Sequence, residues 1–422
     1  MRKFVALALI QLVFVAACGG GGGYGGGGGT PPPPPVQMIA TPGPPNVESL
    51  KVDVGPPGLT FPAVNTAFVS VTVCVPGSKT MCQTIDHIEV DTGSVGLRIL
   101  SEALTSVTLP PETDGTNPLA ECVQFADGTS YGSLHVADIT LPVSGEAAAN
   151  VNVHIIGDPA YVASIPSNCP PGLQREDTVA SFGANGILGV GPFTDDCNST
   201  GACPLPPAPP LSQNFIYYSC PTPGTCATTT ATVAQQLPNP VTLFPSPDNN
   251  GVIVELPSVA SAGATTVSGS LVFGIGTRTN NGLGTATVLP EDPFTGFITG
   301  TYKGTAYIDG YLDSGSNGSF FNDSSLTVCA APNAGFYCPA STMSETATLK
   351  GTSATTLTAN FSVANADTLF SITSYTAFSN LGGTNSNPMG FDLGLPFFYG
   401  HNVFTAIENA NTPGGMGPYF AY

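Results

Sequence analysis

Apolar and polar residues alternate with a period of two in many short segments of this chain. In Phe68–Val73, for example, every second residue is a valine and the residues between them are mostly polar. This alternation is typical of β-strands with one buried face. Similar segments follow at 88–90, 134–141, 151–156, 252–256, 269–273 and 297–312. Only Ala231–Leu237 offers a modest helix, so the pattern predicts an all-β protein.

The strand pattern is interrupted at residues 195–230, which contain four Cys and seven Pro. We interpret this segment as an insertion held by disulfides, or as a connection between two lobes, with a second β region beginning near Val241. The length suits two β lobes better than one very large sandwich. The predicted lobes are residues 46–230, which include the 195–230 insertion, and residues 231–422.

Composition narrows the functional classes. The 422 residues include 51 Gly and 41 Pro, and only 9% are charged, which argues against long amphipathic helices and coiled coils. The net charge is −19 with only 9 Lys and Arg, so nucleic acid is not an expected partner. Because 41% of the chain is apolar, we expect a folded protein rather than disorder by charge repulsion. We also predict a monomer.

The N-terminus resembles an export signal. Arg2 and Lys3 precede an apolar run, Phe4–Ala17, that is too short to span a bilayer. The run ends in Ala-Ala-Cys18, which resembles the bacterial lipoprotein box, in which the Cys is lipidated; an ordinary signal with a chance Cys is the alternative. We therefore predict a signal peptide at 1–17, lipidation at Cys18 and a Gly/Pro-rich tether at 18–45.

These features predict a protein of the bacterial cell envelope, held to a membrane by the lipid on Cys18. The residue after the Cys is Gly19 rather than the Asp associated with retention in the inner membrane, so an outer-membrane anchor is favoured. Which side of that membrane the protein faces stays open.

Ten cysteines remain after Cys18, and an even number in an exported chain implies disulfides. Short spacings suggest four pairs and leave a fifth, although spacing alone does not prove connectivity. The pairs are Cys74–Cys82, Cys197–Cys203, Cys220–Cys226, Cys329–Cys338 and, as the remainder, Cys122–Cys169.

We expect neither a metal site nor a cofactor. The chain contains no CxxC or HExxH motif, and its four histidines are scattered. His135 and His154 alternate with apolar neighbours, so we place both on the polar, solvent-facing sides of strands.

Two segments, Val90–Ser94 and Leu312–Ser316, share the pattern Asp-hydroxyl-Gly-Ser. Each follows an apolar strand, and one falls in each predicted lobe. Two carboxylates close enough to share a proton can activate water and protonate a carbonyl oxygen, which together hydrolyse an amide. We therefore predict Asp91 and Asp313 as a catalytic pair.

The neighbours of each Asp have roles that suit this chemistry. Thr92 and Ser314 can brace the two loops against each other. Each glycine of the motif permits a tight turn and a close approach of backbone N–H groups to the carboxylates. Ser94 and Ser316 can orient the carboxylates. We therefore predict supporting roles for six residues: Thr92, Gly93, Ser94, Ser314, Gly315 and Ser316.

These motifs resemble those of pepsin-like aspartic peptidases. The resemblance extends to apolar-apolar-Gly segments at Gly186–Gly191 and Phe391–Phe398, and in order it covers Ala67 to Glu408. It implies a bilobal double β-barrel with a cleft between the lobes, where a peptide or protein substrate binds. It also implies a flap formed by Phe125, Asp127 and Gly128. The overall pattern is similar to that of an uncharacterised group of bacterial lipoproteins.

The chain departs from that family at the flap. Phe125 stands where the family has a Tyr, and Arg98 stands where it has the Trp that this Tyr contacts; Arg98 could pair with a carboxylate or lower the pKa values of the dyad. Two hypotheses follow. The first is an envelope-tethered aspartic endopeptidase, and the alternative is a non-catalytic protein of the same fold that binds peptide or glycan or has a structural role in the envelope.

A third possibility, a serine hydrolase, rests on the G-x-S-x-G pattern at Gly128–Gly132. That chemistry needs a helix after the motif, whereas the following residues alternate as a strand. A β-turn is the better interpretation.

Overall fold

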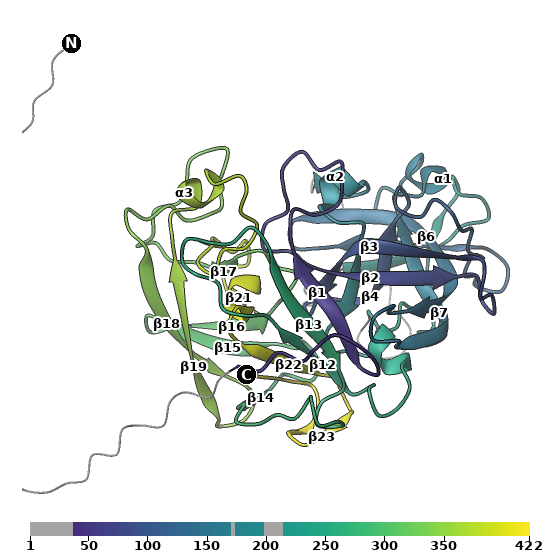
Figure 1. Ribbon diagram of the computed structural model, residues 1–422. Helices are drawn as coiled ribbons and strands as arrows, with labels where there is room; N and C mark the ends of the chain where they lie inside the picture. The colour runs from purple at the N-terminus through teal and green to yellow at the C-terminus, as the bar shows by residue number, and fades with distance from the viewer. Residues whose placement is uncertain (1–36, 170–173, 198–213) are drawn as a thin grey trace, which may run out of the picture. The chain divides into compact units, whose positions relative to one another are not determined.

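The computed structural model describes residues 37–169, 174–197 and 214–422. The predicted signal peptide, Cys18 and the first part of the tether lie outside these residues. The described residues form strands joined by turns, as Figure 1 shows. The α-helices are single turns, namely α1 (Pro159–Val162), α2 (Val179–Phe182), α3 (Ala366–Phe370) and α4 (Leu395–Phe398). Within the described ranges no helix is long and apolar enough to cross a membrane.

The larger sheet contains sixteen of the described strands. Residues 47–156 contribute β1 (Val47–Val52), β2 (Ala67–Cys74), β3 (Cys82–Asp91), β4 (Val95–Leu100), β5 (Leu119–Gln124), β6 (Gly128–Thr140) and β7 (Ala147–Ile156). Residues 174–229 contribute β8 (Gln174–Arg175), β9 (Gly186–Val190), β10 (Asn214–Ser219) and β11 (Ala227–Thr229). The later strands are β12 (Gly251–Glu255), β13 (Val267–Phe273), β14 (Val288–Pro290), β22 (Asn402–Ala406) and β25 (Tyr419–Ala421).

Part of this sheet closes on itself. The strands run in the order β6-β7-β4-β9-β3-β2, and β2 also pairs with β6, so the six strands form a barrel. Its interior is filled by the apolar residues of the alternating pattern, such as Val71, Val90 and Leu97, which are fully buried. Beyond β2, the sheet continues through β1, which lies beside β13 in Figure 1 and pairs with it along its whole length.

A second sheet has the order β19-β18-β15-β16-β21-β17-β20. Its strands are β15 (Ile298–Tyr302), β16 (Thr305–Leu312), β17 (Ser319–Phe321), β18 (Met343–Lys350), β19 (Thr356–Val363), β20 (Gly382–Gly383) and β21 (Gly390–Leu393). A small hairpin, β23 (Asn411–Thr412) with β24 (Gly415–Met416), stands apart. The core of the second sheet is aromatic, since Phe321 packs against Tyr302 and Phe391 with ring centroids 5.0 Å and 5.6 Å apart.

The prediction of an all-β protein is confirmed, and the segments predicted as strands lie in strands. Two boundaries were wrong. Residues 297–312 form two strands rather than one, because Lys303 and Gly304 both have positive φ and turn the chain back on itself. Near Val241 the chain forms a short 3-10 helix, Pro240–Leu243, and the next strand begins only at Gly251.

The predicted helix at Ala231–Leu237 shrinks to a 3-10 turn, Val233–Gln235. Ala231 and Leu237 are instead fully buried in a cluster with Leu119 and Tyr217. The packing of the two ends leaves only one turn of helix between them.

Four of the five predicted disulfides are present, which confirms those pairs. They are Cys74–Cys82, Cys122–Cys169, Cys220–Cys226 and Cys329–Cys338. The fifth predicted pair includes Cys203, which lies outside the described residues.

The prediction that His154 faces solvent was wrong. Its side chain is fully buried, and its Nδ1 atom lies 3.0 Å from Glu121 Oε2. The residue does sit on the polar side of its strand, but further chain covers that side and Glu121 supplies the partner that burial requires. His135 is partly buried and contacts the backbone carbonyl of Leu109 at 2.9 Å.

Candidate active site

Asp91 and Asp313 lie in two matching strand arrangements. Asp91 ends β3, and β9 lies between β3 and β4, parallel to the first and antiparallel to the second. Asp313 follows β16, and β21 lies between β16 and β17 with the same two directions. Each Asp therefore lies at the end of a strand that pairs with a parallel neighbour, β9 or β21. This pairing fixes the position of the loop that carries the Asp.

Two hydroxyl groups join these loops. Thr92 Oγ1 donates to Leu312 O at 3.0 Å and accepts from Ser314 N at 3.0 Å. Ser314 Oγ donates to Val90 O at 2.7 Å and accepts from Thr92 N at 3.1 Å. All of these groups are buried, so each loop holds the other through hydrogen bonds shielded from water.

The glycines bring the carboxyl groups together. Gly93 N donates to Asp91 Oδ1 at 2.7 Å, and Gly315 N donates to Asp313 Oδ1 at 2.8 Å. A Cβ atom on Gly93 would lie 2.7 Å from Asp313 Cγ, and one on Gly315 would lie 2.6 Å from Asp91 Oδ1. Each carboxyl thus occupies the space that a larger residue in the opposite loop would fill.

The Asp313 carboxyl lies within side-chain hydrogen-bonding reach of the Asp91 carboxyl. Burial raises the pKa of Asp313 well above its usual range, and the neighbouring charges of Asp91 and Asp392 raise it further, against the lowering effect of the Gly315 N–H. This pair can hold one proton between two carboxylates at a pH where isolated Asp residues have lost theirs.

The two serines of the motifs differ. Ser316 Oγ donates to Asp313 Oδ2 at 3.0 Å. Ser94 Oγ is buried and makes no hydrogen bond to any described residue, so the expected contact between Ser94 and Asp91 is not present. The support around the two carboxyls is therefore asymmetric.

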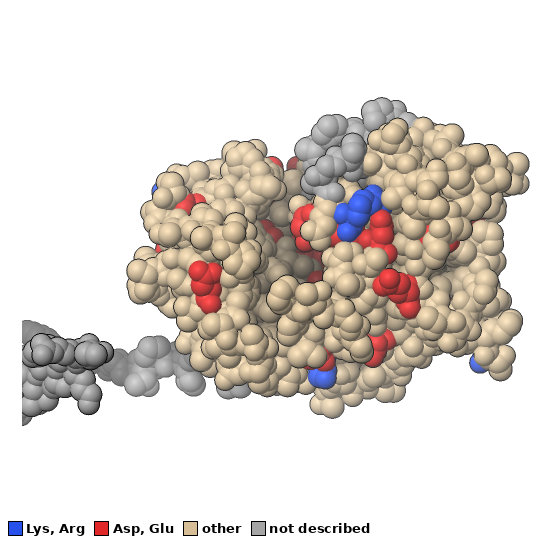
Figure 2. Space-filling view, turned by 90° about the horizontal axis from the view of Figure 1, so that it is seen from above, with Lys and Arg blue, Asp and Glu red and all other residues tan. Residues whose placement is uncertain are grey.

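The pair lies in a cleft of about 1200 Å³. Figure 2 shows a hollow on this face of the molecule with acidic side chains in and beside it. Besides both loops, the residues that line the cleft include Phe125, Asp127, Phe182, Phe320 and Phe378. The arrangement combines apolar walls for binding with a polar floor, as expected of a ligand site.

The predicted flap is a hairpin between β5 and β6. Its tip contains Phe125 and Asp127, which line the cleft, and Gly128, directly after the tip, pairs in parallel with Gln174. Arg98 does not reach the carboxyl pair. It lies fully buried behind the flap, 3.0 Å from Glu121 and 3.5 Å from Asp196, with its guanidinium 6.0 Å from the Phe125 ring.

A family model matches residues 42–422, and its description reads "Protein of unknown function (DUF3443)". The chain belongs to this family. No curated protein matches the chain. The matched residues include both loops of the carboxyl pair, so the candidate site lies within the DUF3443 region of the chain.

Sequence reasoning missed five acidic residues that line the DUF3443 cleft. They are Glu89, Glu176, Asp196, Asp367 and Asp392. Glu89 stands two residues before Asp91, and the alternation of a strand places it on the same face, so its position was a usable signal. Asp392 stands at the position in its apolar-apolar-Gly segment that the apolar Ile187 occupies in the other segment. An acid at a position expected to be apolar was a second signal of a site residue.

Asp392 adds a third carboxyl next to the pair. It is buried, its Oδ1 has no hydrogen-bond partner among the described residues, and the Ser316 hydroxyl lies against it. Burial raises the pKa of Asp392 well above its usual range, although the contact with Ser316 acts in the opposite direction.

Among the described residues, one group of side chains has the spacing of a metal site, namely Cys329, Cys338 and Asp367. The two cysteines form a disulfide, so their sulfur atoms are not available as thiolate ligands. This group does not fit a metal ion.

Proposed function

We propose that this DUF3443 protein is an aspartic endopeptidase with a pepsin-like, bilobal fold. The observation that carries the proposal is the position of Asp91 and Asp313, whose carboxyls lie within hydrogen-bonding reach of each other on braced loops that line a large cleft. The matching strand arrangements around β9 and β21 support a division into two similar halves. In this view the predicted lobes at 46–230 and 231–422 meet at the carboxyl pair.

The chemistry follows from the shared proton. A water between the carboxyls loses a proton to the ionised member of the pair as it attacks a peptide carbonyl carbon. The protonated member donates its proton to the carbonyl oxygen, which yields a tetrahedral intermediate. The member that took the proton from water then gives it to the amide nitrogen, while the other member takes a proton from a hydroxyl group of the intermediate. The C–N bond breaks, an amine and a carboxylic acid are released, and the pair is left with one proton again.

The location of the protein is part of the proposal. A lipid on Cys18 would anchor the chain to a bacterial membrane, with the outer membrane favoured, and the Gly/Pro-rich segment would hold the cleft away from the surface. An endopeptidase placed there would act on polypeptides of the envelope.

The proposal is tested with an unfolded polypeptide as substrate, incubated from acid to neutral pH and examined for cleavage by mass spectrometry. We expect cleavage that is abolished by Asp91→Asn and by Asp313→Asn, since either change removes the shared proton site. Asp86→Asn, an exposed residue on the same strand as Asp91, is the matched control and should retain activity. Cleavage that persists in Asp91→Asn would contradict the proposal.

The alternative, a binding protein without turnover, is favoured by one observation at the flap. The Arg98–Phe125 contact stands where pepsin-like peptidases have a Trp–Tyr pair. Peptide or glycan binding in the cleft without cleavage by the wild-type protein would support this alternative, whereas cleavage blocked by pepstatin would rule it out.

A further inference from the structure

Three carboxyl groups line the cleft beside the catalytic pair, and they come from three different elements. Glu89 is on β3, Asp127 is at the tip of the flap, and Glu176 follows β8. Their charges interact with one another, and that of Glu89 also interacts with Asp91. The three groups therefore form one acidic wall that runs from the flap toward the pair.

Glu176 is the most informative member of this wall. The residue as a whole is only 7% exposed. Its backbone is held to β6, because Glu176 N donates to Thr129 O at 3.0 Å and Ser130 Oγ donates to Glu176 O at 2.9 Å. The side chain lies against Gly128, where a Cβ atom would be 2.2 Å from Glu176 Cδ. Its position is therefore rigidly defined.

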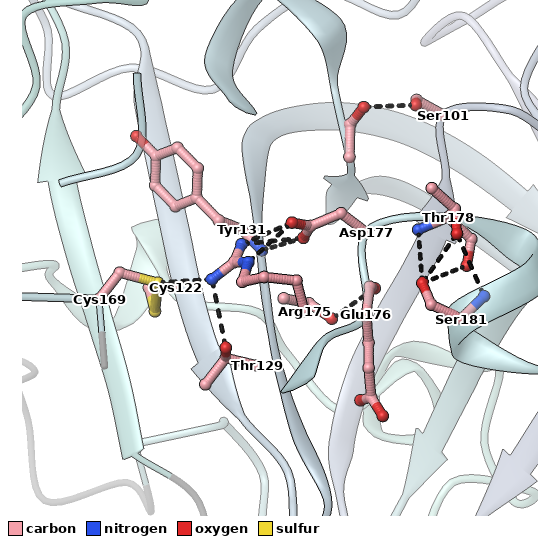
Figure 3. Close-up of polar contacts among 12 residues, drawn as sticks. Ser101, Cys122, Thr129, Tyr131, Cys169, Arg175, Glu176, Asp177, Thr178 and Ser181 are labelled. Carbon is pink, nitrogen blue, oxygen red and sulfur yellow. Dashed lines mark hydrogen bonds and ion pairs between the residues drawn. A yellow bond between two sulfur atoms is a disulfide. The ribbon is translucent and has the colours of Figure 1, made fainter. Parts of the chain in front are cut away.

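The carboxylate of Glu176 nevertheless has no partner. No described residue donates a hydrogen bond to it or forms an ion pair with it, and it lines the cleft. Figure 3 shows it pointing away from the neighbouring Arg175–Asp177 pair, with no contact drawn to its oxygens. Arg175 is engaged by Asp177 at 2.7 Å, so the adjacent cation is already neutralised. A buried carboxylate without a partner is costly unless a ligand supplies one.

The charge balance of the cleft indicates what is missing. Its described lining includes eight carboxyl groups and no Lys, Arg or His. The segments 170–173 and 198–213, which the structure does not describe, contain none of these residues in their sequence. Burial raises the pKa of Glu176 to about 8, with Asp127 and Asp177 adding to the rise and Arg175 opposing it. Burial also raises the pKa of Glu89, with Asp91, Asp127 and Glu176 adding to it.

We infer that Glu89, Asp127 and Glu176 form a subsite for the cationic side chain of a lysine or arginine in a bound polypeptide. The inference rests on the proposed function in one respect, that the polypeptide is the substrate of the neighbouring pair. Phe125 and Phe182, whose rings pack edge to face at 5.8 Å, line the same part of the cleft and can cover the aliphatic stem.

A long organic cation fits this site better than a metal ion does. The oxygens of these three residues are not among the described groups whose ligand atoms all lie within 4.8 Å of one another. One metal ion would leave at least one carboxylate out of reach, whereas an ammonium or guanidinium group has several donors that point in different directions.

The test uses two short fluorescent peptides of Ala, Ser and Leu that differ at one central position, Lys in one and uncharged norleucine in the other. Binding is measured by fluorescence anisotropy and cleavage by the ratio of kcat/KM values. We expect the Lys peptide to bind at least about tenfold more tightly, since hydrogen bonds to charged groups contribute more than neutral ones do. In Glu176→Gln the preference should fall to about twofold or less, with norleucine binding unchanged.

Asp86→Asn, which removes one charge from the exposed side of β3, is the matched control and should keep the full preference. If Glu176→Gln fails to fold, Asp127→Asn on the flap tip serves in its place. Equal binding of the two peptides by the wild type, or an unchanged preference in the folded variant, would overturn the subsite.

Failure of the subsite and failure of the peptidase proposal are distinguishable. Binding of the Lys peptide that depends on Glu176, without cleavage, supports the subsite and argues against the peptidase. Equal cleavage of both peptides supports the peptidase and overturns the subsite. Both peptides share the catalytic pair, so its titration cancels in the ratio, and the Lys preference should rise with pH as Glu176 ionises near its pKa of about 8.

Discussion

At the scale of single residues, the two halves of the site differ in where they carry an extra acid. Two positions before each Asp of the pair, the strand pairs with its parallel neighbour: Glu89 with Ile187, and Tyr311 with Asp392. One acid is present in each pair, but on opposite strands. The backbone arrangement is repeated, whereas its electrostatics are not, so the two carboxyls of the pair are in different surroundings.

Replacement of Asp392 tests this asymmetry. The charge of Asp392 raises the pKa of Asp313, so Asp392→Asn should lower it. Activity that needs a proton on the pair is lost as pH rises through that pKa. The alkaline limb of the pH profile of kcat/KM should therefore move to lower pH by about 0.5 to 1 unit. Asp309→Asn, which removes a charge elsewhere in the same sheet, should leave the limb in place; a shift to higher pH in Asp392→Asn would contradict the prediction.

The hydroxyl of Thr92 should be important for stability as well as geometry. Thr92→Val keeps the shape but leaves the buried Leu312 O and Ser314 N without their partner, which should lower the free energy of unfolding by about 2 kcal/mol or more. Chemical denaturation measures this. Thr72→Val is the matched control, because Thr72 bonds Thr84 on an exposed face, and it should change stability by about 0.5 kcal/mol or less. If both variants lost a similar amount of unfolding free energy, the hydrogen bonds of Thr92 between the two loops would contribute no more to stability than an exposed hydrogen bond does.

At the scale of elements, the flap depends on a buried cluster against which its own strands pack. β5 carries Cys122, whose disulfide to Cys169 spans 47 residues and lies in a buried cluster with Tyr131 and Tyr218. Tyr131 is therefore packed into this cluster, 5.7 Å from Tyr218, and is not part of the cleft lining. The flap has no tyrosine at its tip, and its support comes from this cluster and from Phe125 against Phe182.

Removal of this disulfide should destabilise the protein more than removal of a short one. Cross-linking restricts the unfolded chain more when the loop is longer, which gives about 4 kcal/mol for the Cys122–Cys169 loop and about 2.5 kcal/mol for Cys74–Cys82 by the chain-entropy model. The double variants Cys122→Ala/Cys169→Ala and Cys74→Ala/Cys82→Ala, compared by denaturation, test the order. A larger loss for the short loop would contradict it.

At the scale of the whole molecule, burial of acids dominates the electrostatics. Burial raises the pKa of Glu146 and Glu176 to about 8 and that of Glu255 to about 7. An unfolded Glu has a pKa of about 4.3, so between these values the folded protein holds protons that the unfolded chain releases. Folding is therefore favoured by these groups at low pH, and this contribution is lost as pH rises toward 8.

The melting temperature should accordingly be higher near pH 5 than near pH 8, by about 5 °C or more. Thermal unfolding followed by circular dichroism at constant ionic strength measures the difference. Glu176→Gln removes one of the titrating groups and should make the dependence shallower, whereas Asp86→Asn should not. A melting temperature that rises between these pH values would contradict the prediction.

The sequence by itself determined the all-β class, most strand positions, four disulfide pairs and the two Asp loops. These features depend on local pattern: a period of two, the spacing of cysteines, and a motif that stands out against few charges. The two misplaced boundaries and the lost helix depended on a turn at Lys303 and on the burial of Ala231 and Leu237, which no local pattern shows.

Only the tertiary structure decided which acids meet in the cleft and which polar residues are buried. Glu89, Glu176 and Asp392 are far apart in the chain, and strand pairings such as β6 with β8 and β16 with β21 bring them to the lining of one cleft. The sequence pattern placed His154 on a solvent-facing side and Arg98 near the carboxyl pair, yet both share the buried Glu121. The physical reason is that a charged side chain must reach either solvent or a partner of opposite charge. Packing between distant segments determines which of the two is available to it.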